Sequence, residues 1–192
     1  FPTPETTELN PLSPYALQKQ IGEQYCQLYS KVYDLETVSL RYFNVYGEGM
    51  PTQGAYCNVM GAFSSSQKEG KSLKIFGDGS QKRDFTYVKD TCNALISICK
   101  KKNNEGKTYN IGSGKNIPIS ELIKTISNVL NIKIKLIKDK KRKRVTSSEV
   151  DNLLCDNKFI KKDIKWIPKI SLNEGIKLTA NWIINQKEYK TD

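Results

Sequence analysis

The sequence contains no histidine, which removes several kinds of active site at once. A triad of the Ser–His–Asp type uses an imidazole as its general base, and zinc centres commonly use imidazole nitrogens as ligands. The sequence also has no apolar run that approaches the length of a membrane-spanning helix. Histidine-dependent triads, a metal site and insertion into a membrane are therefore not expected.

Cysteine is scarce, and its pattern argues against disulfide bonds. The five cysteines are odd in number, and no two of them form a Cys-x-x-Cys pair. This usage is typical of a reducing compartment rather than of a disulfide framework, and it predicts a cytoplasmic location. The cysteines are Cys26, Cys57, Cys92, Cys99 and Cys155.

Positive charge outweighs negative charge, with 31 Lys and Arg against 20 Asp and Glu and a net charge of +11. Such an excess occurs in proteins that bind nucleic acid or a membrane surface. Most of it here is scattered lysine, which is typical of solvated faces. The basic run at 138–144 resembles a nucleic-acid or nuclear-localisation patch, but it lacks interleaved aromatic residues for stacking on bases. We therefore expect no nucleic-acid partner.

Local patterns in the first 50 residues predict a loop, a helix and a strand. Residues 1–14 are rich in Pro and Thr and are typical of a loop. Apolar residues then recur at helical spacing along one face. Residues 37–43 are β-branched and aromatic, as in a strand, which continues to Gly47. The apolar face of the helix carries Ile21, Tyr25, Leu28, Tyr29 and Val32.

Further helices and strands alternate along the rest of the chain. Helices are predicted at 90–99, from Pro118 and from Leu172, and strands at 108–111 and 132–136. We expect Asp90 to be the N-cap of the first of these helices. The inward-facing residues are expected to be Ala94, Leu95 and Ile98 in the first helix, Leu122, Ile123, Ile126, Val129 and Leu130 in the second, and Ile176, Thr179, Ala180 and Ile183 in the third.

Tyr15 and Lys19 form the pattern with the most specific chemistry. Residues four apart share one face of a helix, about one turn from each other. An ammonium group that close to a phenol favours the phenolate, so Tyr15 is a candidate for proton exchange near neutral pH. By spacing alone, the pair is more typical of two neighbours on a helix surface, because Tyr-x-x-x-Lys occurs often by chance.

The residues around this pair resemble a known family. The segments 2–6 and 11–19 are similar to the extended short-chain dehydrogenases/reductases, and within them to the nucleotide-sugar epimerases and dehydratases. The resemblance continues to Trp182. It implies that Tyr15 is the catalytic acid/base, and that Lys19 promotes its ionisation and holds the nicotinamide ribose of bound NAD.

Two more segments resemble signatures of the same family. In the segment 41–47, the resemblance implies that Asn44 contacts the nucleotide-sugar, and that Tyr42 and Val45 border the nicotinamide. The alternative for Asn44 is a turn residue. In the segment 77–85, it implies that Arg83 grips the diphosphate, for which a planar guanidinium is well suited.

The alternative for Arg83 is a surface residue beside a hairpin turn, because Gly77-Asp78-Gly79 separates two strand-like runs and favours positive φ angles. Asp84 is expected to be structural and to orient that arginine. Four further substrate contacts follow from the resemblance. They are Asn58 near the start of a helix that faces the diphosphate, Ile75 in the nucleoside pocket, Asn110, for which a structural role is equally expected, and Arg144, although Val145 stands where the family usually has Pro.

The resemblance also implies the fold. It is an α/β fold, the C-terminal part of a Rossmann-type doubly wound parallel sheet with a smaller α/β substrate-binding domain. Residues 1–50 are assigned to the first, and residues 51–192 mainly to the second, with some segments returning to the Rossmann sheet. The family's Gly-rich dinucleotide fingerprint is missing from the sequence. We therefore expect this chain to be the C-terminal part of a longer enzyme.

The predicted function is NAD-dependent epimerisation of a nucleotide-sugar, at C4 of a UDP-hexose, through a 4-keto intermediate. The resemblance also implies a homodimer formed through the helix that follows Tyr15. A 4,6-dehydratase is the alternative within the family. From another class, a non-catalytic module that binds a nucleotide-sugar or nucleic acid is the further alternative.

Overall fold

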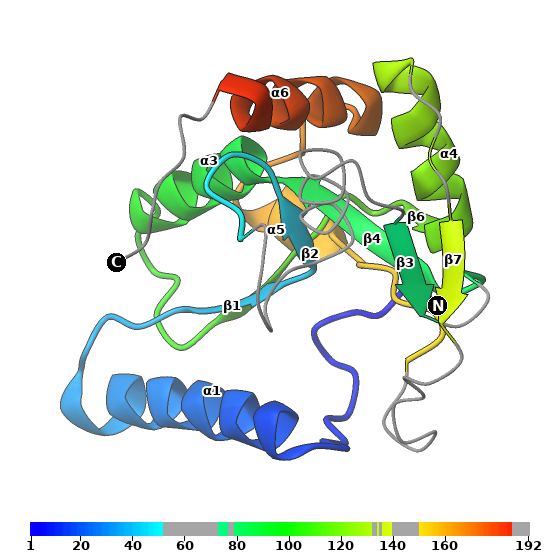
Figure 1. Cartoon of the computed structure of the whole chain (residues 1–192). Helices are drawn as coiled ribbons and strands as arrows, with labels where there is room; N and C mark the ends of the chain where they lie inside the picture. The colour runs from blue at the N-terminus through cyan, green and yellow to red at the C-terminus, as the bar shows by residue number, and fades with distance from the viewer. Residues whose placement is uncertain (52–72, 77–78, 132–133, 135, 140–149, 186–192) are drawn as a thin grey trace, which may run out of the picture.

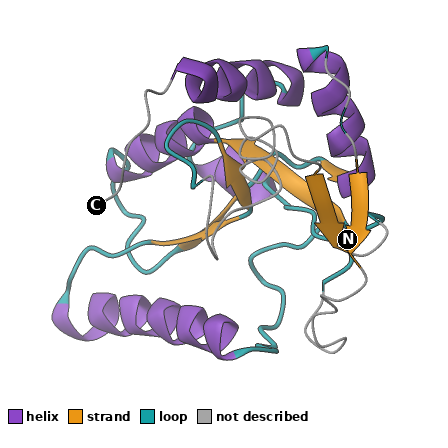
Figure 2. Ribbon diagram, viewed as in Figure 1, coloured by secondary structure: helices purple, strands orange, loops and turns teal. Residues whose placement is uncertain are grey.

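The computed structural model describes residues 1–51, 73–76, 79–131, 134, 136–139 and 150–185, with the backbone alone for 73–76 and 136–139. None of the helices in these ranges is long and apolar enough to cross a membrane. The helices are α1 (Pro14–Tyr33), α3 (Val88–Cys99), α4 (Ile119–Leu130), α5 (Lys158–Asp163) and α6 (Leu172–Asn185). The strands are β1 (Ser39–Tyr42), β2 (Asn44–Tyr46), β3 (Leu73–Phe76), β4 (Lys82–Tyr87), β5 (Thr108–Ile111), β6 (Asn116–Pro118) and β7 (Leu136–Asp139) (Figure 2).

The strands pair mainly in parallel. The parallel pairs are β1–β5, β2–β4 and β3–β7, and β6 joins β4 antiparallel. Only Phe43 separates β1 from β2, and its N–H donates to the carbonyl of Ile111 at 3.0 Å, so the ladder with β5 extends past the end of β1. Parallel strands need crossover connections, and described helices lie in two of them: α3 between β1 and β5, and α3 and α4 between β3 and β7. The predicted α/β fold class is confirmed.

Helices lie on both sides of the strands (Figure 1). Helix α1 runs along one side, next to β1, whereas α3, α4 and α6 lie on the other. The buried apolar residues form two groups. The first core cluster joins β2 and β4 to α4 and α6 and consists of Tyr46, Phe85, Tyr87, Leu122, Ile123, Ile126 and Ile176. The second core cluster joins β5 to α3 and α5 and consists of Ala94, Ile98, Tyr109, Ile111, Ile160 and Trp166.

A polar group borders the second core cluster at the end of α5. The Asp163 carboxylate accepts a hydrogen bond from the Tyr109 hydroxyl and forms ion pairs with Lys107 at 3.2 Å and Lys101 at 3.3 Å. The hydrogen bond from Tyr109 and the two ammonium groups hold the pKa of Asp163 below its usual range, although partial burial acts in the opposite direction. Asp163 thus fixes α5 against β5 by charge as well as by packing.

Because the pKa of Asp163 is lowered, the stability of the folded chain decreases at acid pH. The ionised Asp163 carboxylate contributes fully to the free energy of unfolding above the ordinary pKa of aspartate. This contribution is lost as pH falls through the lowered pKa of Asp163. Asp163→Asn is therefore expected to lower Tm at pH 7, and the difference from wild type should shrink as pH falls below about 4. Thermal unfolding over a pH series measures this difference. A difference that stays constant down to acid pH would contradict the assignment.

Several predicted details of the helices are confirmed. In α4, Leu122, Ile123 and Ile126 are buried, and Val129 and Leu130 pack partly buried against the first core cluster. In α6, Ile176, Thr179, Ala180 and Ile183 are all buried, as expected from their spacing.

Others are wrong. Tyr87, not Asp90, is the N-cap of α3, and the Asp90 carboxylate instead accepts the backbone N–H of Ile170 at 2.9 Å. Leu95 is 40% exposed, because the buried face of α3 consists of Asp90, Thr91, Ala94 and Ile98. Of the strand expected at 132–136, residues 132, 133 and 135 lie outside the described residues, and Leu136 is the first residue of β7.

The Gly77–Gly79 segment does not connect a hairpin. Its preceding strand, β3, pairs with β7, and its following strand, β4, pairs with β2 and β6. The backbone at Gly79 has a φ angle of +79°, as its composition predicts. The turn therefore directs the chain from one pair of strands to another.

Candidate functional site

The candidate proton-transfer pair lies on the first turn of α1. Ser13 is the N-cap, its hydroxyl accepting the N–H of Ala16 at 3.1 Å, and Pro14 follows it at the start of the helix. Both residues favour a well-defined helix start. One turn on, the Lys19 ammonium lies 5.2 Å from the centroid of the Tyr15 ring, and Tyr15 is 65% exposed. The phenol is thus accessible on a fixed helical turn with a cation over its ring.

The β1–β2 segment carries the next three candidates, Tyr42, Asn44 and Val45. The side-chain oxygen of Asn44 is buried and has no hydrogen-bond partner within the described residues. A buried polar atom in that state is costly unless a ligand or water bonds to it. Tyr42 is 48% exposed at the end of β1. Burial of part of its ring raises the pKa of the Tyr42 phenol, and the thiols of Cys92 and Cys99 add to this effect.

Arg83 lies on β4, beside this segment. Asn44 pairs with Phe85 in the register of β2 and β4. Because side chains alternate along a strand, Arg83 lies on the same face as Phe85, and therefore as Asn44. The guanidinium group donates to the backbone carbonyls of Lys82 at 2.9 Å and Asp151 at 3.5 Å. The pairing thus brings Asn44 and Arg83 to one face of two adjacent strands.

The neighbouring Asp84 is completely buried on the other face of β4. Its carboxylate accepts four hydrogen bonds: from the N–H and the hydroxyl of Ser113, at 2.8 and 2.6 Å, and from the N–H groups of Gly114 and Cys155, at 2.9 and 3.2 Å. Burial raises the pKa of Asp84, although these hydrogen bonds act to lower it. Asp84 is structural, as expected. It fixes the strand that carries Arg83, since its hydrogen bonds lead to other segments.

Asn110 on β5 is buried, and its side chain is occupied within the chain. Its amide donates to the backbone carbonyls of Thr3 at 3.1 Å and Asp156 at 3.5 Å. Its own N–H donates to the Glu5 carboxylate at 2.8 Å. These contacts hold the N-terminal segment against β5 and favour the structural alternative for Asn110.

The remaining candidates have no described side chain. Asn58 and Arg144 lie outside the described residues, as do Cys57 and most of the basic run. Ile75 lies on β3, of which only the backbone is described. Among the described side chains, no three Cys, Asp or Glu residues come together as a metal site.

Two polar clusters near the candidates were not predicted from the sequence. The Arg41 guanidinium forms a bidentate ion pair with the Glu23 carboxylate of α1. After β2, Glu48 accepts from the Tyr87 hydroxyl at 2.6 Å and pairs with Lys89 at 3.0 Å. Although burial acts to raise it, the pKa of Glu48 is lowered by these two partners. The only local signal for either cluster is that Glu23 follows Lys19 by four residues.

Comparisons with known proteins show the family of this chain. The model of the NAD dependent epimerase/dehydratase family matches residues 1–112. The chain therefore belongs to this family. It is 36% identical over 176 residues to a UDP-glucuronate 4-epimerase of Thermodesulfobacterium geofontis, with 90% of this chain and 50% of the relative covered.

Solved structures of epimerases are similar as well. A UDP-glucose 4-epimerase of Thermotoga maritima, solved with UDP-glucose, matches with a TM-score of 0.87 and 32% identity over 96% of this chain and 57% of its own. A UDP-glucuronic acid 4-epimerase of Bacillus cereus, solved with UDP-glucuronic acid and NAD, matches with a TM-score of 0.84 and 29% identity over 96% and 56%. The chain spans about half the length of the curated relatives it matches.

Proposed function

We propose that this chain belongs to an NAD-dependent enzyme that epimerises a nucleotide-sugar, at C4 of a UDP-hexose. The observation that carries the proposal is the Tyr15–Lys19 pair on a capped helical turn in a member of this family. To test this proposal, the protein that carries this chain is incubated with NAD and either UDP-glucose or UDP-galactose, and the sugar products are analysed. Interconversion of the two hexoses is expected.

The residues of the chain fit the binding of NAD at this turn. Lys19 offers three N–H donors for ribose hydroxyls, and Tyr42 and Val45 are proposed to border the nicotinamide. When bound, NAD supplies the acceptor and donor for a hydride. We assign the proton transfer to Tyr15. Its phenolate accepts the proton of the C4 hydroxyl. After the 4-keto sugar has rotated so that its opposite face is presented, the phenol returns the proton to the C4 oxygen. The Lys19 cation stabilises the phenolate during this exchange.

The diphosphate and the sugar are proposed to lie on the face shared by Asn44 and Arg83. The free oxygen of Asn44 can accept a hydrogen bond from a sugar hydroxyl, and Arg83 can give charge-assisted hydrogen bonds to phosphate oxygens. Asn58, Ile75 and Arg144 remain proposed substrate contacts, and Asn110 is proposed only as a second-choice contact. The net positive charge of the chain also favours an anionic substrate.

A nucleotide-sugar 4,6-dehydratase is the second candidate, because the matching family includes dehydratases. A product that has lost water would identify it. We also propose a homodimer in the cytoplasm and the division into residues 1–50 and 51–192. The dimer is testable by sedimentation.

Arg83→Ala is expected to weaken UDP binding by about 1.5–3 kcal/mol, the range for a hydrogen bond to a charged group. Isothermal titration calorimetry of the protein that carries this chain measures it. Lys82→Ala is the matched control, since it removes an adjacent exposed cation on the same strand and should change the affinity little. Equal effects of the two substitutions would contradict the role of Arg83.

The same titrations address the nucleic-acid alternative. Neutralising Lys140, Lys141 and Lys143 is expected to change UDP binding far less than Arg83→Ala, because exposed charges are screened. A nucleic-acid binder would instead depend on these lysines and lose affinity steeply as salt rises. Strong salt-sensitive binding to DNA or RNA without UDP binding would overturn the enzyme assignment.

A further inference from the structure

We infer that Arg41 and Glu23 are positioning residues for the Tyr15–Lys19 pair, an inference that rests on the proposed function of that pair. The starting observation is that α1 is not held by apolar packing. None of its residues is buried among the described part of the chain. Its apolar face points away from the strands, with Tyr25 58% and Leu28 50% exposed. Among the described residues, α1 is therefore held to the strands by polar contacts.

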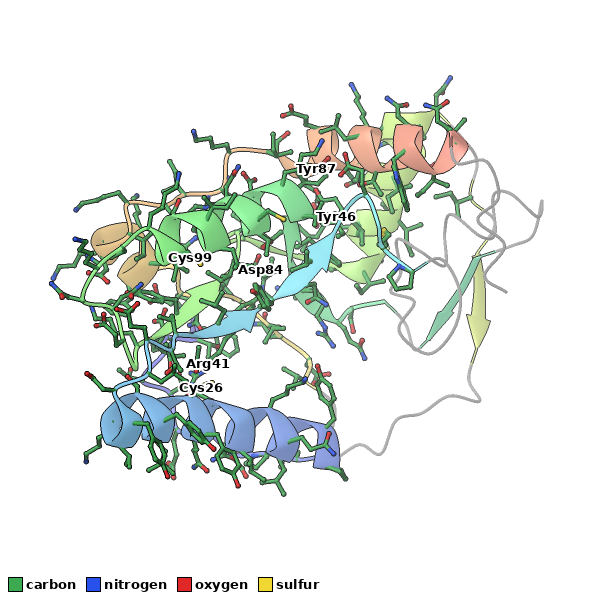
Figure 3. The ribbon with its side chains drawn as sticks, turned by 90° about the vertical axis from the view of Figure 1, so that its left-hand side faces the viewer. Cys26, Arg41, Tyr46, Asp84, Tyr87 and Cys99 are labelled. Carbon is green, nitrogen blue, oxygen red and sulfur yellow. The ribbon has the colours of Figure 1, made fainter. Side chains whose placement is uncertain are left out.

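Arg41 supplies the strongest of these contacts. Its Nε donates to Glu23 Oε2 at 2.8 Å and its Nη2 to Glu23 Oε1 at 2.6 Å. The two side chains are only 24% and 13% exposed. A planar guanidinium that meets a carboxylate with two parallel hydrogen bonds fixes both distance and orientation. In Figure 3, Arg41 reaches from β1 toward α1.

The same guanidinium also holds the segment that leads into α1. Its Nη1 donates to the backbone carbonyl of Glu5 at 2.9 Å. The Glu5 carboxylate in turn accepts the N–H of Asn110, which pairs with Arg41 in the register of β1 and β5. One side chain on the sheet thus fixes α1 and the loop before it.

Helical geometry connects this contact to the proton-transfer pair. Glu23 follows Lys19 by four residues and Tyr15 by eight, so the three lie along one face at steps of about 6 Å. Fixing Glu23 sets the rotation and the height of Tyr15 and Lys19. A second contact on this face, from the Thr37 hydroxyl to the Cys26 carbonyl at 2.7 Å, has the same effect farther along.

The other end of the contact is on the strand that carries the proposed ligand residues. Arg41 immediately precedes Tyr42 and lies three residues before Asn44. The Arg41–Glu23 pair therefore fixes the phenol of Tyr15 relative to the proposed nicotinamide and sugar contacts. Misplacement of reacting groups by about 1 Å can cost about 100-fold in rate.

The test compares Glu23→Ala with Gln24→Ala, the next residue on the exposed side of α1, in the protein that carries this chain. At temperatures well below Tm, Glu23→Ala is expected to lower kcat about 10- to 100-fold, with KM and the affinity for UDP within about threefold. Glu23→Gln, which keeps one acceptor, should recover part of kcat. Gln24→Ala should leave all these values unchanged. A Glu23→Ala protein that is folded and has wild-type kcat would overturn the inference.

Amide hydrogen exchange decides the inference without a turnover assay. Glu23→Ala is expected to speed exchange within residues 14–33 selectively, relative to β4 and α6. If the wild-type protein converts no UDP-hexose, the proposed function fails, whereas this exchange difference still supports the positioning contact. Unchanged protection of 14–33 would overturn it.

Discussion

Tyr15→Phe is expected to lower kcat by about 100- to 10,000-fold, the range for a group that transfers a proton in the rate-limiting step. Phenylalanine keeps the ring beside the Lys19 ammonium and removes only the hydroxyl. The residue is 65% exposed at the first turn, so the loss should not disturb the packing of α1. KM and UDP affinity should change little, because the lost interaction belongs to the chemical step. Steady-state kinetics with a UDP-hexose and NAD provide the measurement.

Tyr25→Phe is the matched control for this substitution. It removes the same hydroxyl from the same helix, but from the exposed apolar face, where Tyr25 lies 6.4 Å from Tyr29 between ring centroids. Wild-type kcat is expected. If Tyr15→Phe retained activity within a few-fold of wild type, Tyr15 would not be the acid/base, and the proposed mechanism would be wrong.

Helices α4 and α6 could be predicted well because their signal is local, whereas the short helix α5 was not predicted. In α4, Leu122, Ile123 and Ile126 recur at helical spacing, and the same residues are buried. Asn131 ends the helix in a left-handed conformation, which asparagine tolerates. A single short segment therefore contains the period, the buried face and the stop.

Strand pairing could not be predicted in the same way. Two strand-like runs around Gly77–Gly79 locally resemble a hairpin, yet β3 pairs with β7 and β4 with β2. The choice depends on segments distant in the sequence. Helix α1 illustrates a related difficulty. Its apolar stripe at Ile21 to Val32 is evident, but periodicity does not say what covers that face, and in the structure it is exposed.

The candidate site likewise combines residues with a local signal in the sequence and residues that only the folded chain brings together. Tyr15 and Lys19 are four residues apart, so spacing and the family resemblance sufficed to propose them. The Arg41–Glu23 pair joins a strand to a helix, and no local pattern in the sequence predicts that these two residues meet. The orphaned oxygen of Asn44 depends on the surroundings of the folded chain. The proposed reacting groups thus carry a local signal in the sequence, whereas the groups proposed to position them depend on contacts between distant segments.

The most costly substitution for stability is expected at Asp84, which ties three segments together. Its carboxylate bonds to the turn after β5 at Ser113 and Gly114, and to Cys155 in the C-terminal segment. The packing at this junction is tight, since a Cβ atom added to Gly112 would lie 2.3 Å from the Cβ of Cys155. No water is needed to satisfy these donors, because the carboxylate itself accepts from each of them.

Asp84→Asn replaces one carboxylate oxygen with an NH2 group that faces backbone N–H groups. With the NH2 group at the Oδ2 position, the N–H groups of Gly114 and Cys155 lose their acceptor. With the NH2 group at the Oδ1 position, only the N–H of Ser113 loses its acceptor, because the Ser113 hydroxyl also donates to the carbonyl of Lys115 at 3.0 Å. The second orientation is therefore favoured, at about 1–3 kcal/mol for the one unpaired N–H group. The free energy of unfolding should fall by about 1 to 3 kcal/mol, as measured by urea denaturation of the protein that carries this chain. Asp151→Asn, an exposed carboxylate next to the same junction, is the matched control and should stay within about 0.5 kcal/mol of wild type. A loss at Asp84 no larger than at Asp151 would mean that the four hydrogen bonds do not hold the junction.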